Sequence, residues 1–91
     1  MKYLISLSDI LILITSGQIK AARALLGISI ADFAKLAGIG FTTLVRLESS
    51  DGVPSGNIRT FEAVQKAFEQ AGVEFIGTPD KGAGVRWKFD K

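Results

Sequence analysis

The sequence contains no cysteine and no histidine. Their absence excludes disulfide bonds, thiolate nucleophiles, imidazole bases and the common zinc sites. The carboxylates do not compensate, because they are scattered and no two fall at a spacing that suggests an acid–base pair. The glycines form neither a phosphate-binding P-loop nor a strand-bound dinucleotide motif. We therefore expect a protein that is not an enzyme and that uses no cofactor and no metal.

An excess of one charge is also missing, since 11 Lys and Arg residues stand against 9 Asp and Glu residues. The net charge of +2 does not by itself indicate nucleic-acid binding, for which strongly basic domains are the clear cases. With 47% hydrophobic and 22% charged residues, the 91-residue chain is expected to be globular, with one modest core. A chain this short gains stability by dimerising.

The one long hydrophobic run covers residues 3–14, with Lys2 in front of it. A short apolar run after a basic residue has the general form of a signal peptide, but the residues before Gly17 suit cleavage poorly. The run is shorter than the roughly 20 residues of a transmembrane helix, and Asp9 divides it. We favour a structured N-terminal segment, residues 1–14, that forms a strand or a strand pair. The protein is accordingly expected in the cytoplasm, without membrane contact.

Helical spacing of apolar side chains fills residues 15–72. Thr15 and Gln18 fit a capping box, Ser29 caps a second helix, and Gly38 is expected in the left-handed conformation. The expected helices are 19–26, 30–37, 41–48 and a fourth that begins at Ser55 or Gly56 and ends at Ala71. Their inward faces are expected to hold Ile19, Ala22, Leu25, Leu26, Phe33, Ala34, Leu36 or Ala37, Leu44, Leu47, Ile58, Phe61, Val64, Ala67 and Phe68.

Beyond Gly72 the period changes to two, which predicts strands at 73–76 and 85–89 around a turn-rich loop. The fold class is thus mainly α, four helices with a small C-terminal β-hairpin, which the N-terminal segment joins as a strand. An isolated hairpin is marginal in water, so a second copy of the chain is expected to cover its apolar face. For Trp87, core or dimer packing is favoured over base stacking. The expected dimer contacts are Phe75, Val85, Trp87 and Phe89.

Residues 18–72 resemble the helix-turn-helix domain of the Cro/C1-type (XRE-family) transcriptional regulators. The ending 73–91 resembles a small bacterial or phage subset in which a strand pair follows the helices, here interpreted as a dimerisation element. The resemblance rests on the order and spacing of Arg23, Leu26-Gly27-Ile28-Ser29, Phe33-Ala34, Ala37-Gly38-Ile39, Thr43-Leu44, Arg46-Leu47-Glu48 and Pro54. It implies that the helix at about 41–48 lies in the major groove of double-stranded DNA.

Site residues follow from the resemblance and from position on the helices. The expected base contacts are Phe41, Thr42, Thr43, Val45 and Arg46; the expected phosphate contacts are Ser29, Gly40, Asn57 and Arg59. Arg23 and Glu48 are expected to form a structural ion pair. Alternatives remain for some of these residues. Arg46 could instead be a solvated charge, and Phe41 could equally lie at the edge of the core. One of the two threonines could only satisfy backbone groups at the start of the helix, and Thr42 is the one favoured for DNA contact.

The sequence departs from the family pattern at three positions. Relatives often have Gln where Ile30 stands, Ser or Thr where Gly40 stands, and a polar or basic residue where Phe41 stands. Two functions therefore remain open. The first is a sequence-specific DNA-binding regulator that acts as a homodimer on a two-fold site. The second is a protein-interaction module, antitoxin-like or contacting the transcription machinery, that holds a partner through the apolar surface at 41–45.

Overall fold

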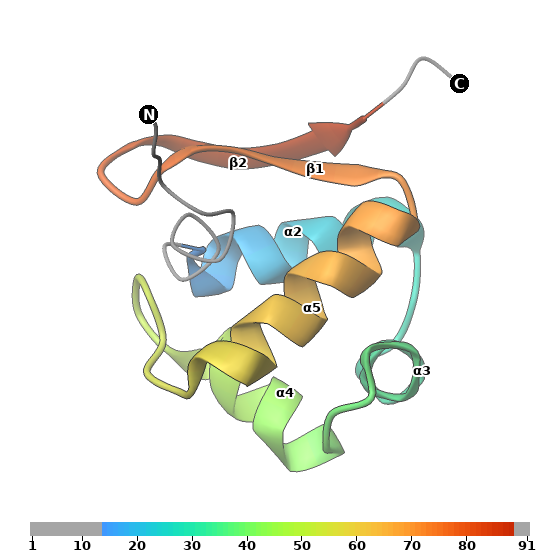
Figure 1. Ribbon diagram of the computed structural model, residues 1–91. Helices are drawn as coiled ribbons and strands as arrows, with labels where there is room; N and C mark the ends of the chain where they lie inside the picture. Colours follow the sequence, from blue (N-terminus) through green and yellow to red (C-terminus); the bar gives the residue numbers. More distant parts are fainter. Residues whose placement is uncertain (1–13, 89–91) are drawn as a thin grey trace, which may run out of the picture.

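The computed structural model describes residues 14–88. Within that range the chain is mainly helical and ends in a two-stranded antiparallel hairpin, as the sequence predicts (Figure 1). The elements are α2 (Ser16–Leu26), α3 (Ile30–Ala37), α4 (Phe41–Ser49), α5 (Ile58–Gln70), β1 (Val73–Thr78) and β2 (Lys81–Trp87). Phe89 and all but the last residue of the N-terminal segment lie outside the described residues, so the expectations for them stay predictions.

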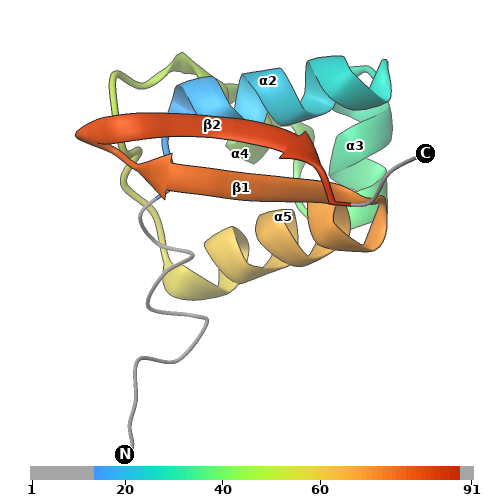
Figure 2. The same ribbon diagram turned by 90° about the horizontal axis from the view of Figure 1, so that it is seen from above.

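The elements are stacked in layers. Figure 1 shows the hairpin along one side of the molecule and α4 on the opposite side, with α2 and α5 between them. Seen from above in Figure 2, β2 runs over α2 and β1 runs over α5, which agrees with the contacts between these elements. The hairpin and α4 therefore face opposite ways.

The helix ends follow the local signals in the sequence. The hydroxyl of Thr15 accepts from the amide of Gln18 at 3.0 Å, and Gln18 Oε1 accepts from the amide of Thr15 at 2.8 Å, which completes the capping box. Ser29 caps α3 by accepting from the amide of Asp32. Gly38 ends α3 with φ of 72°, a left-handed conformation that would strain any side chain with a Cβ. These predictions are confirmed.

The core lies between the four helices, α2 to α5, and the hairpin. Phe33 of α3 stacks on Phe68 of α5 at 3.9 Å between ring centroids, and Phe68 meets Phe75 of β1 edge-on at 5.7 Å. One aromatic column thus joins three elements that are distant in the sequence. The buried apolar residues are Ile14, Ile19, Ala22, Phe33, Ala34, Leu44, Leu47, Phe61, Val64, Ala67, Phe68 and Val73.

Two residues expected in the core, Leu25 and Ile58, are exposed instead. Leu25 is 36% exposed because it lies at the edge of the α2 stripe. Of the two alternatives on α3, Ala37 packs against the core, whereas Leu36 is 57% exposed. Ile58 is 43% exposed because α5 begins there rather than at Ser55 or Gly56. The true cap is Asn57, whose side-chain oxygen accepts from the amide of Thr60.

The hairpin register agrees with the predicted faces, but the strands are longer than predicted. Phe75 pairs with Val85, while Glu74 and Arg86 form an ion pair at 3.1 Å on the other face. The loop predicted for residues 77–84 is wrong, because both strands continue to a turn at residues 79–80. Gly77, with φ of 77°, permits this bulged end: a Cβ there would lie 2.2 Å from the carbonyl oxygen of Gly82.

The inner face of the hairpin is covered in part by its own chain. Val73 is fully buried, and Phe75 and Val85 pack against the core. Gln18 of α2 adds polar anchors, because its Nε2 donates to the carbonyls of Ile76 and Gly84, each at 3.0 Å. Part of this face is thus covered without a second copy, while Phe75 and Val85 are half-buried and Trp87 is 38% exposed. The expectation that a second copy covers the rest stays a prediction.

Replacing Gly77 by alanine should destabilise the fold by about 2 kcal/mol or more, because a strained φ adds to a backbone clash. Gly84→Ala is the matched control: its Cβ would meet only ordinary contacts at 3.7–3.9 Å, so it should stay within about 0.5 kcal/mol of the parent. Urea unfolding of both variants is the measurement. Equal stabilities would show that the bulge does not constrain the hairpin.

Candidate nucleic-acid interface

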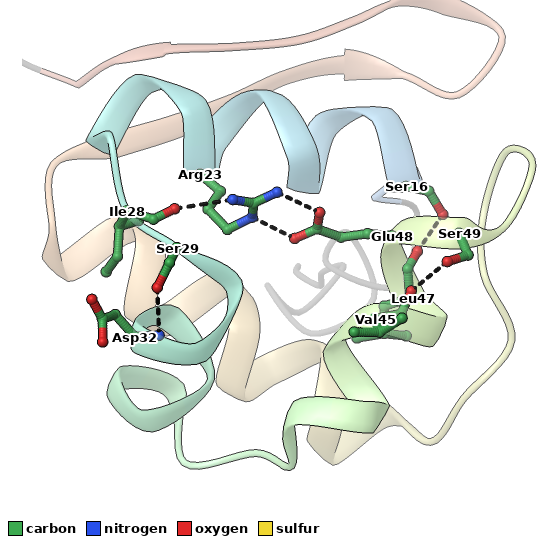
Figure 3. Close-up of polar contacts among 9 residues, drawn as sticks. All are labelled: Ser16, Arg23, Ile28, Ser29, Asp32, Val45, Leu47, Glu48 and Ser49. Atoms are coloured by element: carbon green, nitrogen blue, oxygen red, sulfur yellow. Dashed lines mark hydrogen bonds and ion pairs between the residues drawn. The ribbon is translucent and has the colours of Figure 1, made fainter.

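The C-terminal half of α4 is fixed to α2 by an ion pair. Glu48 is 6% exposed, and its carboxylate receives two hydrogen bonds from Arg23: Nε to Oε2 at 2.8 Å and Nη2 to Oε1 at 2.9 Å (Figure 3). This hydrogen-bonded pairing raises the pKa of Arg23 above its ordinary value. The remaining Nη1 donates to the carbonyl of Ile28 at 3.0 Å. One guanidinium therefore connects α2, the turn before α3, and α4.

A serine binds the same end of α4 from the start of α2. Ser16 is buried, its hydroxyl donates to the carbonyl of Leu47 at 2.5 Å, and its amide donates to the carbonyl of Gly52 at 2.8 Å (Figure 3). The first bond satisfies a helix-end carbonyl, and the second holds the loop that follows α4. Sequence patterns did not reveal this contact, because a serine after a capping threonine usually faces water.

The N-terminal end of α4 is set by the turn after α3. Beyond Gly38, the amide of Ile39 donates to the carbonyl of Ala34 at 3.0 Å, and the Ile39 side chain packs against the core. Ala34 is 3% exposed, where α3 and α4 contact each other. Both ends of α4 are thus held, and the angle between α3 and α4 is fixed.

The outer surface of α4 is mostly apolar and uncharged. Phe41 is 55% exposed, Thr42 and Arg46 are exposed, and Thr43 and Val45 are half-buried. Leu44 and Leu47 point into the core with no exposure. Of the two threonines, Thr43 has its hydroxyl beside Gly40, 3.5 Å from where a Cβ on that glycine would lie.

The four residues expected at phosphates are all exposed: Ser29, Gly40, Asn57 and Arg59. The Ser29 oxygen accepts from the amide of Asp32 at 3.0 Å, so the hydroxyl proton remains to be donated (Figure 3). Asn57 accepts from Thr60 through Oδ1, which leaves its amino group as a donor. Gly40 is the N-cap residue of α4 and has no side chain that could accept a hydrogen bond from the first N–H groups of the helix.

Arg46 has a partner that the sequence did not suggest. Its Nη1 donates to the carbonyl of Ser55, in the loop before α5, at 2.6 Å. The side chain therefore reaches from the last turn of α4 toward the start of α5.

Residues 19–58 match the helix-turn-helix family. The match begins in α2, covers α3 and α4, and ends at the first residue of α5, so it contains the turn and the exposed helix described above. This segment is therefore similar to the helix-turn-helix family, in agreement with the Cro/C1-type resemblance of the sequence. The similarity supports DNA binding and transcription regulation. Among curated proteins, none matches the chain. In the part of the chain that the structure describes, no helix is long and apolar enough to cross a membrane.

Replacing Arg23 by alanine should destabilise the domain by about 3 kcal/mol, because it leaves the buried Glu48 carboxylate without its partner. Arg86→Ala is the matched control, since Arg86 is 61% exposed in its pair with Glu74 and should contribute less than about 1 kcal/mol. Denaturant unfolding measures both. If the two variants lose equal stability, the Arg23–Glu48 pair does not fix α4.

Proposed function

We propose that this protein is a sequence-specific DNA-binding transcriptional regulator that inserts α4 into the major groove and acts as a homodimer. The observation that carries the proposal is the exposed surface of Phe41 and Thr42 on a helix that is fixed at both ends. A rigid helix with an exposed first turn is what major-groove recognition requires.

Base contacts come from the start of α4. Phe41 and Val45 offer apolar surface that suits the methyl group of thymine, and the hydroxyls of Thr42 and Thr43 can bond base edges. Ser29, Asn57 and Arg59 bind phosphates on either side through their donors, and the uncapped N–H groups after Gly40 can bind a further phosphate. These phosphate contacts set the register of α4 in the groove.

A homodimer must present both copies of α4 to one side of the DNA. Because the hairpin and α4 face opposite ways, packing two hairpins face to face would point the helices apart (Figure 1). Side-by-side association along a hairpin edge keeps both helices on one side, as binding to successive major grooves about 34 Å apart requires. Of the expected dimer contacts, Phe75 and Val85 are occupied in the core, whereas Trp87 is 38% exposed. Trp87 is therefore the residue we assign to this interface.

A second candidate function has its own support. Phe41 and Leu36 are 55% and 57% exposed, and such apolar side chains are also suited to binding a partner protein. The two functions differ in their dependence on salt. Duplex binding weakens steeply with salt, by about 0.9 in log K per log unit of salt for each phosphate neutralised, whereas an apolar protein interface responds little.

Phe41→Ala should weaken binding of a duplex selected from a random pool by about 1–2 kcal/mol, because it removes an apolar contact to the bases. Leu36→Ala is the matched control, since it is equally exposed but lies on α3, and it should bind as the parent does. Fluorescence anisotropy at several salt concentrations provides the affinities and the salt slope. A parent protein that selects no duplex, or binds without salt dependence, contradicts DNA binding and favours the protein-interaction module.

Trp87→Ala should raise the dissociation constant of the dimer about tenfold or more, because exposed tryptophans at interfaces commonly dominate the binding energy. It should also weaken binding to a two-fold site far more than binding to a half-site. Val53→Ala, which truncates a similarly exposed apolar residue in the loop after α4, is the control. Sedimentation at matched concentrations is the measurement. A parent chain that stays monomeric and binds both sites equally would rule out the homodimer.

A further inference from the structure

The guanidinium of Arg46 joins two elements at the proposed DNA surface. Nη1 donates to the carbonyl of Ser55 at 2.6 Å, and Ser55 stands two residues before Asn57, the cap of α5. The loop between α4 and α5 is thus held at two points: Ser16 binds Gly52 in its first half, and Arg46 binds Ser55 in its second half.

The second nitrogen of the guanidinium lies beside the start of α5. A Cβ on Gly56 would be 3.8 Å from Arg46 Nη2 and 3.4 Å from Cε2 of Phe61. Phe61 is a core residue, 3% exposed. The guanidinium therefore lies along the backbone just before α5, and that backbone in turn lies against a buried ring. Arg46 is exposed to solvent, but these two neighbours orient its guanidinium.

Base reading would require a different orientation. An arginine that recognises guanine directs two N–H donors away from the protein toward O6 and N7. Arg46 already commits one N–H donor to Ser55, and this bond and the contact at Gly56 orient the guanidinium along the start of α5 rather than outward toward a base. The same bond holds the loop two residues before Asn57, the cap of α5, which the proposed function assigns to a phosphate.

We infer that Arg46 is a positioning residue that fixes the start of α5 relative to α4, and that it does not read a base. The inference rests on the proposed function and deepens it. It assigns base contacts to the start of α4, and it assigns to Arg46, in the last turn of α4, the positioning of the phosphate-binding residues at the start of α5. Asn57 and Arg59 bind phosphates in register with α4 only while Ser55 is held.

The first test compares sequence preference. Duplexes are selected from a random pool with the parent chain and with Arg46→Ala. The variant should bind every duplex about tenfold more weakly, the effect of losing one charge-assisted hydrogen bond, with the same preferred base at each position. Lost preference at one base pair would overturn the inference, as would unchanged affinity for all duplexes.

The second test is a pair of double-mutant cycles. If Arg46 acts through α5, Arg59→Ala should cost little further affinity in the Arg46→Ala background, so the two changes couple. Thr42→Ala is the control partner, because it lies on α4 itself and should add independently. Additive effects in both cycles would overturn the positioning role.

A measurement on the protein without DNA separates this inference from the proposed function. Arg46→Ala should speed hydrogen exchange at the amides of Thr60 and Phe61, which bond to Asn57 in the first turn of α5, and leave the amide of Leu44 in α4 unchanged. If the parent chain selects no duplex but Arg46→Ala speeds exchange at these two amides, the proposed DNA binding is wrong, whereas the role of Arg46 in fixing the start of α5 is supported. Unchanged exchange at Thr60 and Phe61 would overturn the inference whatever the chain binds.

Discussion

Glu48 is a carboxylate held almost entirely out of water, and the position of α4 depends on it. Such a group is tolerated only when donors surround it, and Arg23 supplies two of them in the parallel geometry that suits a carboxylate. Because the same guanidinium also bonds the carbonyl of Ile28, the turn into α3 is fixed by the interaction that fixes α4. The two helices that define the helix-turn-helix segment are therefore oriented from behind, by α2, which leaves the outer surface of α4 uninvolved in holding it.

The layered arrangement separates two tasks. The hairpin stabilises the α2–α5 layer through Val73, Phe75 and the two carbonyls bound by Gln18, on the side of the molecule away from α4. Substitutions on the exposed surface of α4 should then leave the core intact, and changes in the hairpin should leave the geometry of α4 intact as long as the domain folds. The separation also bears on symmetric assembly, because two copies packed face to face through their hairpins would present their α4 helices in opposite directions.

Much of this fold is predictable from local signals. The capping box at Thr15, the cap at Ser29 and the glycine at 38 each depend on neighbours within four residues, and each prediction is confirmed. The predicted length of the strands was wrong because it depends on the approach of Gly77 to Gly82 across the hairpin. The predicted start of α5 was wrong because Ser55, Gly56 and Asn57 all suit an N-cap, and it is Asn57 that accepts from the amide of Thr60. For the candidate site, periodicity identifies which side chains of α4 face outward. It could not reveal that Ser16 and Arg46 bond loop carbonyls, because a serine and an arginine have the same local pattern whether they face water or a carbonyl.

Arg23 and Arg46 illustrate this limit and its consequence for recognition. Both lie in the last turn of an amphipathic helix. Arg23 nevertheless neutralises a buried carboxylate, whereas Arg46 binds a loop carbonyl at the surface. With Arg46 engaged, the part of α4 that remains for the bases has no charge, so attraction to arbitrary DNA would come only from side chains at its margins. Non-specific affinity scales with the number of phosphates neutralised, whereas contacts to thymine methyls form only at the correct sequence. A surface of this composition would bind weakly as a single copy and still discriminate well, because its few favourable contacts are those that carry sequence information.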